Sequence, residues 1–256
     1  MDILLTNDDG IYALGLRAMY RALLRAGHTV HVVAPLTEQS AVGHAITLSL
    51  PLKIKHLREP DFQGVGVTGT PVDCAKLALS SLLDEPPDVL ISGINNGANV
   101  GVDILYSGTV SAATEGALAG LPSLAVSMDN FHPANLDDQA DYTVRLVQDM
   151  DWAALPSRCL LNLNFPDRDL RETLGLRCCP QTQAVYHDRH DHRVDPRGVG
   201  YYWLHGEIPA GEVGQDTDRG LLTQGYITLT PLRFDFTDYE TMDRLQRTLT
   251  APTVSA

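Results

Sequence analysis

The sequence predicts an α/β fold in which helices cover both faces of a mostly parallel β-sheet. Two observations support this prediction. Short apolar segments alternate with amphipathic helical segments through the first two thirds of the chain, and this alternation is typical of parallel sheets. Polar segments directly follow two of the predicted strands, at residues 7–10 and 93–99. Open α/β sheets bind ligands at the carboxyl ends of their strands, so these segments are expected to share one crevice.

The predicted elements of the first third begin with a short apolar strand at residues 3–5. A helix follows and ends at Gly27, and its apolar face consists of Leu16, Met19, Tyr20, Leu23 and Leu24. Residues 29–34 form the second predicted strand, which Pro35 ends.

Pro71 opens the next predicted helix, because proline is favoured in the first helical turn. The apolar stripe of this helix consists of Val72, Ala75, Leu79, Leu82 and Leu83. A strand is predicted at residues 89–92 and a loop at 93–99. A helix is predicted from Ser107 to Gly120, a strand at 123–127, a helix at 136–150 and a strand at 159–165.

The composition and pattern of the sequence change after residue 166. Residues 1–166 are expected to form the main α/β domain, and residues 167–256 a C-terminal extension. Residues 178–206, rich in charge, histidine and glycine, predict a protruding arm with a strand at 201–203. A strand is expected at 226–230 and a terminal helix behind a capping box of Thr237 and Glu240. An arm with exposed aromatic side chains predicts a homo-oligomer.

Composition excludes several classes of protein. The 256 residues include 32 acidic and 19 basic ones, for a net charge of −13, which disfavours a surface that coats nucleic acid. No apolar run reaches the ~20 residues of a membrane span, and the N-terminus lacks the features of a signal peptide. Cys74, Cys159, Cys178 and Cys179 show no metal-ligand spacing, so we expect reduced thiols and a cytoplasmic location.

The first candidate site motif is the acidic pair Asp8 and Asp9, between Asn7 and Gly10. Adjacent carboxylates at a strand end repel each other, and a hard divalent cation reverses that repulsion. Capping of the following helix is the structural alternative for this pair, and the motif by itself leaves both interpretations open.

Three further polar segments follow predicted strands or open a helix. In residues 92–99, Asn95 is a candidate metal ligand and Asn99 a candidate substrate contact, although the segment is also a plausible tight turn. Ser107, Gly108 and Thr109 open a helix, where they either bind an anion or simply cap the helix. The loop at 38–44 offers Ser40 as a hydroxyl ligand and His44 as a titrating group or a structural hydrogen bonder.

One glycine motif does not fit its usual function. Residues 64–69 match G-x-G-x-x-G, but the dinucleotide fingerprint needs a preceding strand and a helix that opens within the motif. The spacers here have strand character themselves, and the helix begins only at Pro71. We therefore predict a strand and turn.

Taken together, these motifs resemble the SurE (survival protein E) family of nucleotidases. The resemblance runs from residue 1 to about residue 235. It rests on residues 5–11 (LTNDDGI), 33–35 (VAP), 38–40 (EQS), 69–74 (GTPVDC), 92–99 (SGINNGAN) and 105–110 (LYSGTV), and on the later segments 195–198, 201–203, 217–218 and 227–232.

The resemblance implies a Rossmann-like three-layer sandwich that hydrolyses nucleoside 5′-monophosphates, with 3′-monophosphates and short polyphosphate as further substrates. It implies one divalent cation per subunit, Mg²⁺ or Mn²⁺, held by the catalytic residues Asp8 and Asp9 with Ser40 and Asn95. It also implies that Asn99, Ser107, Gly108 and Thr109 hold phosphate, and that the C-terminal arm is exchanged between the subunits of a dimer or tetramer.

Competing interpretations belong to other functional classes. A regulatory protein could bind nucleotides in the same crevice without turnover, and phosphate release would distinguish the two. A sugar-nucleotide transferase would need a D-x-D motif, whereas Asp8 and Asp9 are adjacent. A nicotinamide dehydrogenase would depend on the glycines at 64–69.

Overall fold

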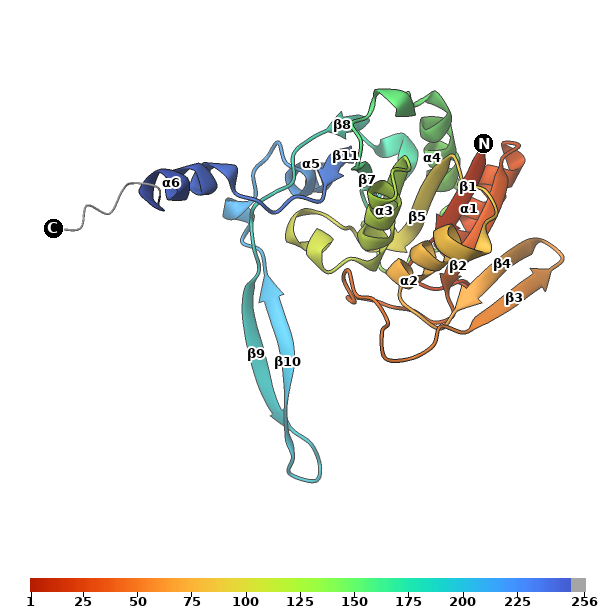
Figure 1. Cartoon of the computed structure of the whole chain (residues 1–256). Coiled ribbons are helices and arrows are strands. Elements are labelled where there is room, and N and C mark those ends of the chain that lie inside the picture. Colours follow the sequence, from red (N-terminus) through yellow and green to blue (C-terminus); the bar gives the residue numbers. More distant parts are fainter. Residues whose placement is uncertain (250–256) are drawn as a thin grey trace.

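The computed structural model describes residues 1–249 and is built around one nine-stranded sheet (Figure 1). The strand order is β3-β4-β2-β1-β5-β6-β7-β11-β8. The strands of this sheet are β1 (Asp2–Thr6), β2 (Thr29–Pro35), β3 (Ile54–Glu59), β4 (Phe62–Val67), β5 (Val89–Asn96), β6 (Ser123–Met128), β7 (Cys159–Phe165), β8 (Leu176–Cys178) and β11 (Ile227–Arg233). The pairings β4–β2–β1–β5–β6–β7 are parallel, and β3 and β11 pair antiparallel with β4 and β7. The predicted α/β sheet is confirmed.

Helices cover both faces of the sheet and make three layers. The α-helices of the described chain are α1 (Leu14–Arg25), α2 (Pro71–Leu77), α3 (Gly108–Leu118), α4 (Asp137–Asp149), α5 (Asp218–Gln224) and α6 (Tyr239–Leu249). Ile3 and Leu5 pack in one core with α1 and α4, and Leu4 packs in the other with α2 and α3. Each of these three side chains is fully buried, which is worth roughly 1.5–3 kcal/mol per side chain. No helix within residues 1–249 has the length and apolarity to cross a bilayer.

Local sequence signals correctly predicted the position of several helices and strands. Pro71 begins α2 behind a capping box of Thr70 and Asp73, and Ser107 caps α3 by accepting the N–H of Val110 at 3.0 Å. The glycine motif lies in β4 and the turn after it, which confirms the strand interpretation.

Other predicted details were wrong. The strand predicted at 89–92 continues as β5 to Asn96 through an irregular register between Ser92 and Asn95, so the first half of the predicted loop is paired strand. Leu24 is 44% exposed, because it lies at the edge of the buried face of α1. The capping box of Thr237 and Glu240 is not formed: Asp238 caps α6 instead, by accepting the N–H of Thr241 at 3.0 Å.

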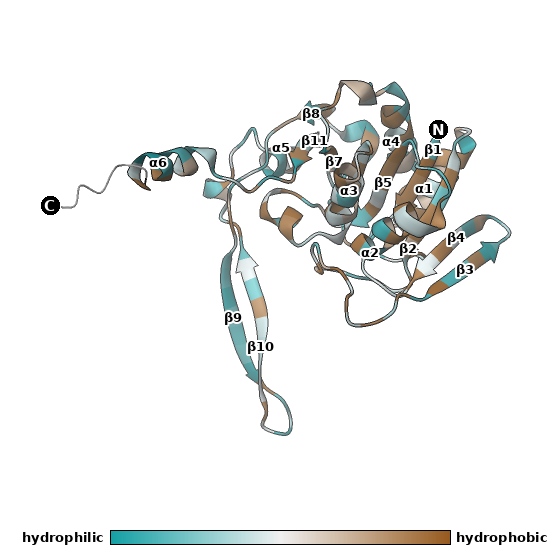
Figure 2. Cartoon of the chain, viewed as in Figure 1, coloured by the Kyte–Doolittle hydropathy of each residue, from teal (hydrophilic) through white to brown (hydrophobic). Residues whose placement is uncertain are grey.

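The protruding arm is a hairpin of β9 (His187–Val194) and β10 (Gly200–Glu207), which extends away from the body in Figure 1. It is shorter than the predicted range of 178–206. Cys179, Thr182 and Ala184 are buried, because residues 178–184 pack against the main body. Figure 2 contrasts the hydrophilic β9 with the hydrophobic central strands. All four cysteines are free thiols.

Gly15 permits the close contact of α1 with β5, and this contact gives a stability prediction. A Cβ atom at Gly15 would lie 2.0 Å from the carbonyl oxygen of Ile94. We expect Gly15→Ala to lower the free energy of unfolding by roughly 1–3 kcal/mol, because backbone on both sides must shift. Urea unfolding measures this change. The matched control is Gly211→Ala, where a Cβ meets nothing within 4 Å; an equal effect of both substitutions would contradict the packing argument.

Candidate active site

The candidate site lies where β1 and β5 end beside the N-terminus of α3. Asp8 and Asp9 follow β1 directly. The hydroxyl of Thr109, in the first turn of α3, donates a hydrogen bond to Oδ1 of Asp8. The backbone N–H of Asn96, the last residue of β5, donates to Oδ2 of Asp9 at 3.1 Å. Two neighbouring strands and one helix therefore fix the acidic pair.

Gly108 is required by the contact of α3 with Asp8. A Cβ at Gly108 would lie 2.7 Å from Cβ of Asp8 and 2.9 Å from Cγ of Pro71. The absence of a side chain lets the helix N-terminus approach the carboxylate. The positive end of the helix dipole therefore faces Asp8.

The electrostatics of the acidic pair are unfavourable within the chain itself. Burial raises the pKa of Asp8, and the hydrogen bond from Thr109 opposes this rise. Burial, then the charge of Asp8, raises the pKa of Asp9 to about 7, with a smaller contribution from Glu38. Among residues 1–249, no lysine, arginine or histidine forms an ion pair with either carboxylate.

This environment fits a divalent cation. Asp8 is buried and Asp9 is partly buried. Two adjacent carboxylates in such a setting without a positive partner repel each other, and a hard cation with oxygen ligands would remove that repulsion. The Nδ2 group of Asn95 donates to the carbonyl of Gly97 at 2.6 Å, which leaves Oδ1 as the ligand atom of this amide. The residues present therefore suit Mg²⁺ or Mn²⁺.

The loop after β2 carries Ser40 and is tied to the site by its backbone. The N–H of Gln39 donates to the carbonyl of Asp8 at 2.8 Å, and the N–H of Gly43 donates to the carbonyl of Tyr106 at 2.9 Å. The Ser40 hydroxyl itself donates to Glu38 at 2.5 Å. The fold thus brings the predicted hydroxyl ligand into a loop that is bonded directly to Asp8.

The remaining predicted phosphate contacts differ in their surroundings. Ser107 is buried as the cap of α3, and Thr109 bonds Asp8. Asn99 belongs to a buried polar network: its Nδ2 group donates to the hydroxyl of Ser127 at 2.8 Å, and its N–H donates to Oδ1 of Asn164 at 2.8 Å. The side-chain nitrogen of Asn99 is therefore already engaged within the protein.

Sequence reasoning named His44 as a titrating group or a structural hydrogen bonder, but it did not predict the charged cluster that His44 forms beside the site. Nε2 of His44 lies 2.6 Å from Oε1 of Glu115, and Nζ of Lys76 lies 3.1 Å from Oε2. The hydrogen bond with His44, followed by the interactions with Lys76, lowers the pKa of Glu115. Glu115 lies about two turns into α3, so it anchors the loop that carries Ser40 and does not face Asp8. No local pattern links these three residues, which come from three different segments.

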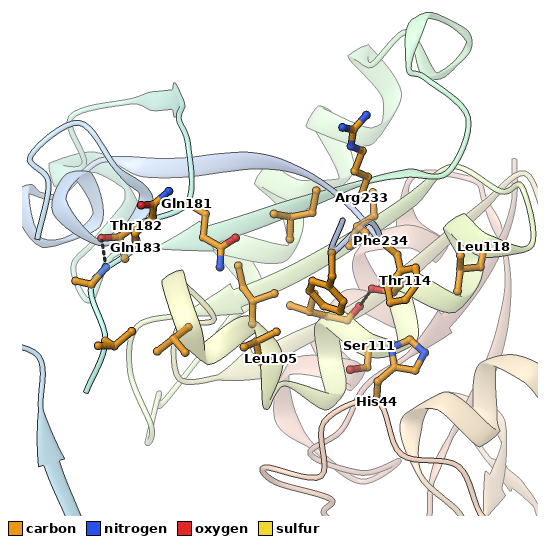
Figure 3. A pocket seen from close by; sticks show the side chains of 18 residues that line it. His44, Leu105, Ser111, Thr114, Leu118, Gln181, Thr182, Gln183, Arg233 and Phe234 are labelled. Carbon is orange, nitrogen blue, oxygen red and sulfur yellow. Dashed lines mark hydrogen bonds between the residues drawn. The ribbon is translucent and has the colours of Figure 1, made fainter. Parts of the chain in front are cut away.

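A cavity of about 720 Å³ lies next to this anchor and is distinct from the acidic crevice. In Figure 3, His44, Thr114 and Phe234 line one side of it, and Gln181 and Thr182 line the other. None of the eight predicted site residues lines this cavity, whose wall is mostly apolar. No carboxylate lines it, so it lacks the acidic ligands that a divalent cation requires.

Comparison with known proteins agrees with this architecture. Residues 3–188 match the family model described as survival protein SurE. The chain is 64% identical over 247 residues to a "5′-nucleotidase SurE" of Nitratidesulfovibrio vulgaris (strain DSM 19637 / Miyazaki F), covering 96% of this chain and 92% of the relative. It is 62% identical over 249 residues to the protein with the same name from Oleidesulfovibrio alaskensis, covering 97% and 96%.

A solved structure gives the same result for the fold. The crystal structure of the SurE protein from Aquifex aeolicus superimposes with a TM-score of 0.83 at 35% sequence identity, covering 97% of this chain and all of the other. The alignments span nearly the whole length of each protein, and the acidic pair, the β5 loop and the α3 N-terminus lie inside the matched range. The chain belongs to the survival protein SurE family.

Proposed function

We propose that this chain is a metal-dependent phosphomonoesterase that hydrolyses nucleoside 5′-monophosphates to nucleoside and phosphate. The observation that carries the proposal is the acidic pair. Asp8 is buried and bonded by Thr109 at the N-terminus of α3, and Asp9 is partly buried beside it. The name 5′-nucleotidase on a relative that is 64% identical supports the same activity. Nucleoside 3′-monophosphates and short polyphosphate are further proposed substrates.

The proposed mechanism assigns a role to each part of the site. Asp8, Asp9, Ser40 and Asn95 would hold a divalent cation. When bound, it would supply positive charge to polarise the phosphoryl group and to lower the pKa of water. The Ser107 and Thr109 hydroxyls and the first amides of α3 would orient the phosphate and stabilise charge on its oxygens. Thr109 also fixes the Asp8 carboxylate, so one residue links the proposed metal site to the phosphate site.

Phosphate release tests this proposal. The full chain is incubated with Mn²⁺ or Mg²⁺ and a panel of 5′- and 3′-monophosphates, p-nitrophenyl phosphate and tripolyphosphate. We expect release from 5′-monophosphates, with a turnover that depends on the base and on the metal. Tight binding of AMP with no release from any compound would favour the alternative, a nucleotide-binding regulatory protein.

We also propose that the active form is a dimer or tetramer in which the arm packs against a second copy. Trp203 and Leu204 on β10 are 60% and 64% exposed, and α6 buries no residue although Met242 and Leu245 lie on one side of it. Such exposed apolar groups are typical of interfaces. Light scattering should give two or four times the mass of the chain, and removal of residues 187–207 should lower it. A monomer at micromolar concentration would contradict this prediction.

A further inference from the structure

Phe131 is an exposed aromatic side chain beside the candidate active site. It lies in the loop that follows β6 (Ser123–Met128), and it is 72% exposed. Its ring packs directly on the backbone of Gly97: a Cβ at Gly97 would lie 2.6 Å from Cε1 of the ring. Gly97 has a φ of +104°, so the absence of a side chain permits both the turn and the contact.

The contact with Gly97 places Phe131 close to the acidic pair. Gly97 follows Asn96, whose N–H binds Asp9. The strands β1, β5 and β6 are consecutive neighbours in the sheet. Two strand spacings amount to about 10 Å, which is comparable to the distance between the phosphate and the base of a nucleotide. A phosphate at Asp8 and Asp9 could therefore be followed by a base at the β6 loop.

The backbone around Phe131 is held by hydrogen bonds on both sides of this residue. The N–H of Asp129 donates to the carbonyl of Phe165 at 2.8 Å, and Nδ2 of Asn130 donates to Asp167 at 2.8 Å. The N–H of His132 donates to Oδ1 of Asn130 at 2.7 Å. These bonds fix the backbone on either side of an apolar ring that remains largely in solvent. When a base stacks on such a ring, few further rotatable bonds of the protein have to be fixed, so the cost in conformational entropy is small.

We propose that Phe131 is the stacking platform for the nucleobase of the substrate. Base–aromatic stacking tolerates every base, because each base has a π-face, so the site would accept purine and pyrimidine nucleoside monophosphates, with a preference for the larger purines. This inference rests on the proposed function for its substrate class. It assigns recognition of the base to the β6 loop and recognition of the phosphate to β1 and α3.

The test compares substrates with and without a base. For Phe131→Ala, we expect KM for AMP to rise roughly 5- to 150-fold, the range of a lost base–aromatic stack. KM for ribose 5-phosphate, which has no base, should stay within about twofold, and kcat should change little for either compound. Phe131→Trp should restore the KM for AMP, because a larger ring stacks at least as well.

A binding measurement separates this inference from the proposed function. Calorimetry with the phosphonate analogue of AMP, whose P–C bond resists hydrolysis, reports affinity without turnover. Phe131→Ala should weaken binding by the same factor, and the matched loop control His132→Ala should not. Equal affinity in wild type and Phe131→Ala, or equal losses for AMP and ribose 5-phosphate, would overturn the stacking role. If the wild type shows no turnover, the proposed hydrolysis is wrong. The calorimetric comparison of wild type with Phe131→Ala would still decide whether Phe131 stacks on the base.

Discussion

Replacement of Asp8 or Asp9 by asparagine is expected to reduce phosphate release from AMP by at least roughly 10²- to 10³-fold, the scale on which single electrostatic groups act in catalysis. Asparagine keeps the size of the side chain and its hydrogen-bonding oxygen but removes the negative charge that the proposed cation needs. The initial rate of phosphate release, with saturating Mn²⁺ and AMP, measures the loss.

The same substitutions should preserve the fold. Burial raises the pKa of both Asp8 and Asp9, which means that the charged carboxylates are disfavoured in the folded chain without a cation. Neutral asparagine removes this penalty, so the melting temperature without added metal should stay equal or rise. This pattern of lost activity with retained stability is typical of functional residues.

Asp141→Asn provides the matched control for the acidic pair. Asp141 is a surface carboxylate that forms an ion pair with Arg25 at 2.6 Å, with both side chains about half exposed. Exposed pairs contribute roughly 0–1 kcal/mol, so this variant should retain activity within about twofold. Wild-type turnover by the asparagine variant of Asp8 or of Asp9 would contradict the site assignment.

Removal of divalent cations should have the second large effect. After treatment with EDTA and dialysis, we expect phosphate release to fall to near background and to return on addition of Mn²⁺ or Mg²⁺. The physical reason is that no lysine, arginine or histidine of the described residues forms an ion pair with Asp8 or Asp9. The proposed cation would therefore supply the positive charge that the α3 amides and hydroxyls alone do not provide.

Thermal unfolding gives a readout of the same site that is independent of catalysis. A cation that binds only the folded chain raises the free energy of unfolding by RT ln(1 + [L]/Kd), and the melting temperature rises with it. Mn²⁺ should therefore stabilise the wild type and have little effect on Asp9→Asn. Undiminished turnover in EDTA, or equal stabilisation of both proteins by Mn²⁺, would be incompatible with the proposed metal site.

The sequence predicted those parts of the fold that depend on local interactions. The alternation of apolar strands and amphipathic helices indicated the parallel sheet, Pro71 marked the start of α2, and Ser107 capped α3. These signals act within a few residues along the chain, through hydrogen bonds to free backbone groups and through the periodicity of buried side chains. The capping of α6 was misjudged by one residue because both Thr237 and Asp238 can accept such a bond.

The sequence alone determined the fold class, the adjacency of two carboxylates and the strand ends at which they lie. Only the tertiary structure decided that Thr109 reaches Asp8 across 101 positions, that His44 pairs with Glu115 across 71 positions, and that Phe131 rests on Gly97. The antiparallel insertion of β11 between β7 and β8 was also decided at this level. Contacts of this kind depend on strand order and on which side chains fill the space between layers, and both are set by the packing of the whole chain.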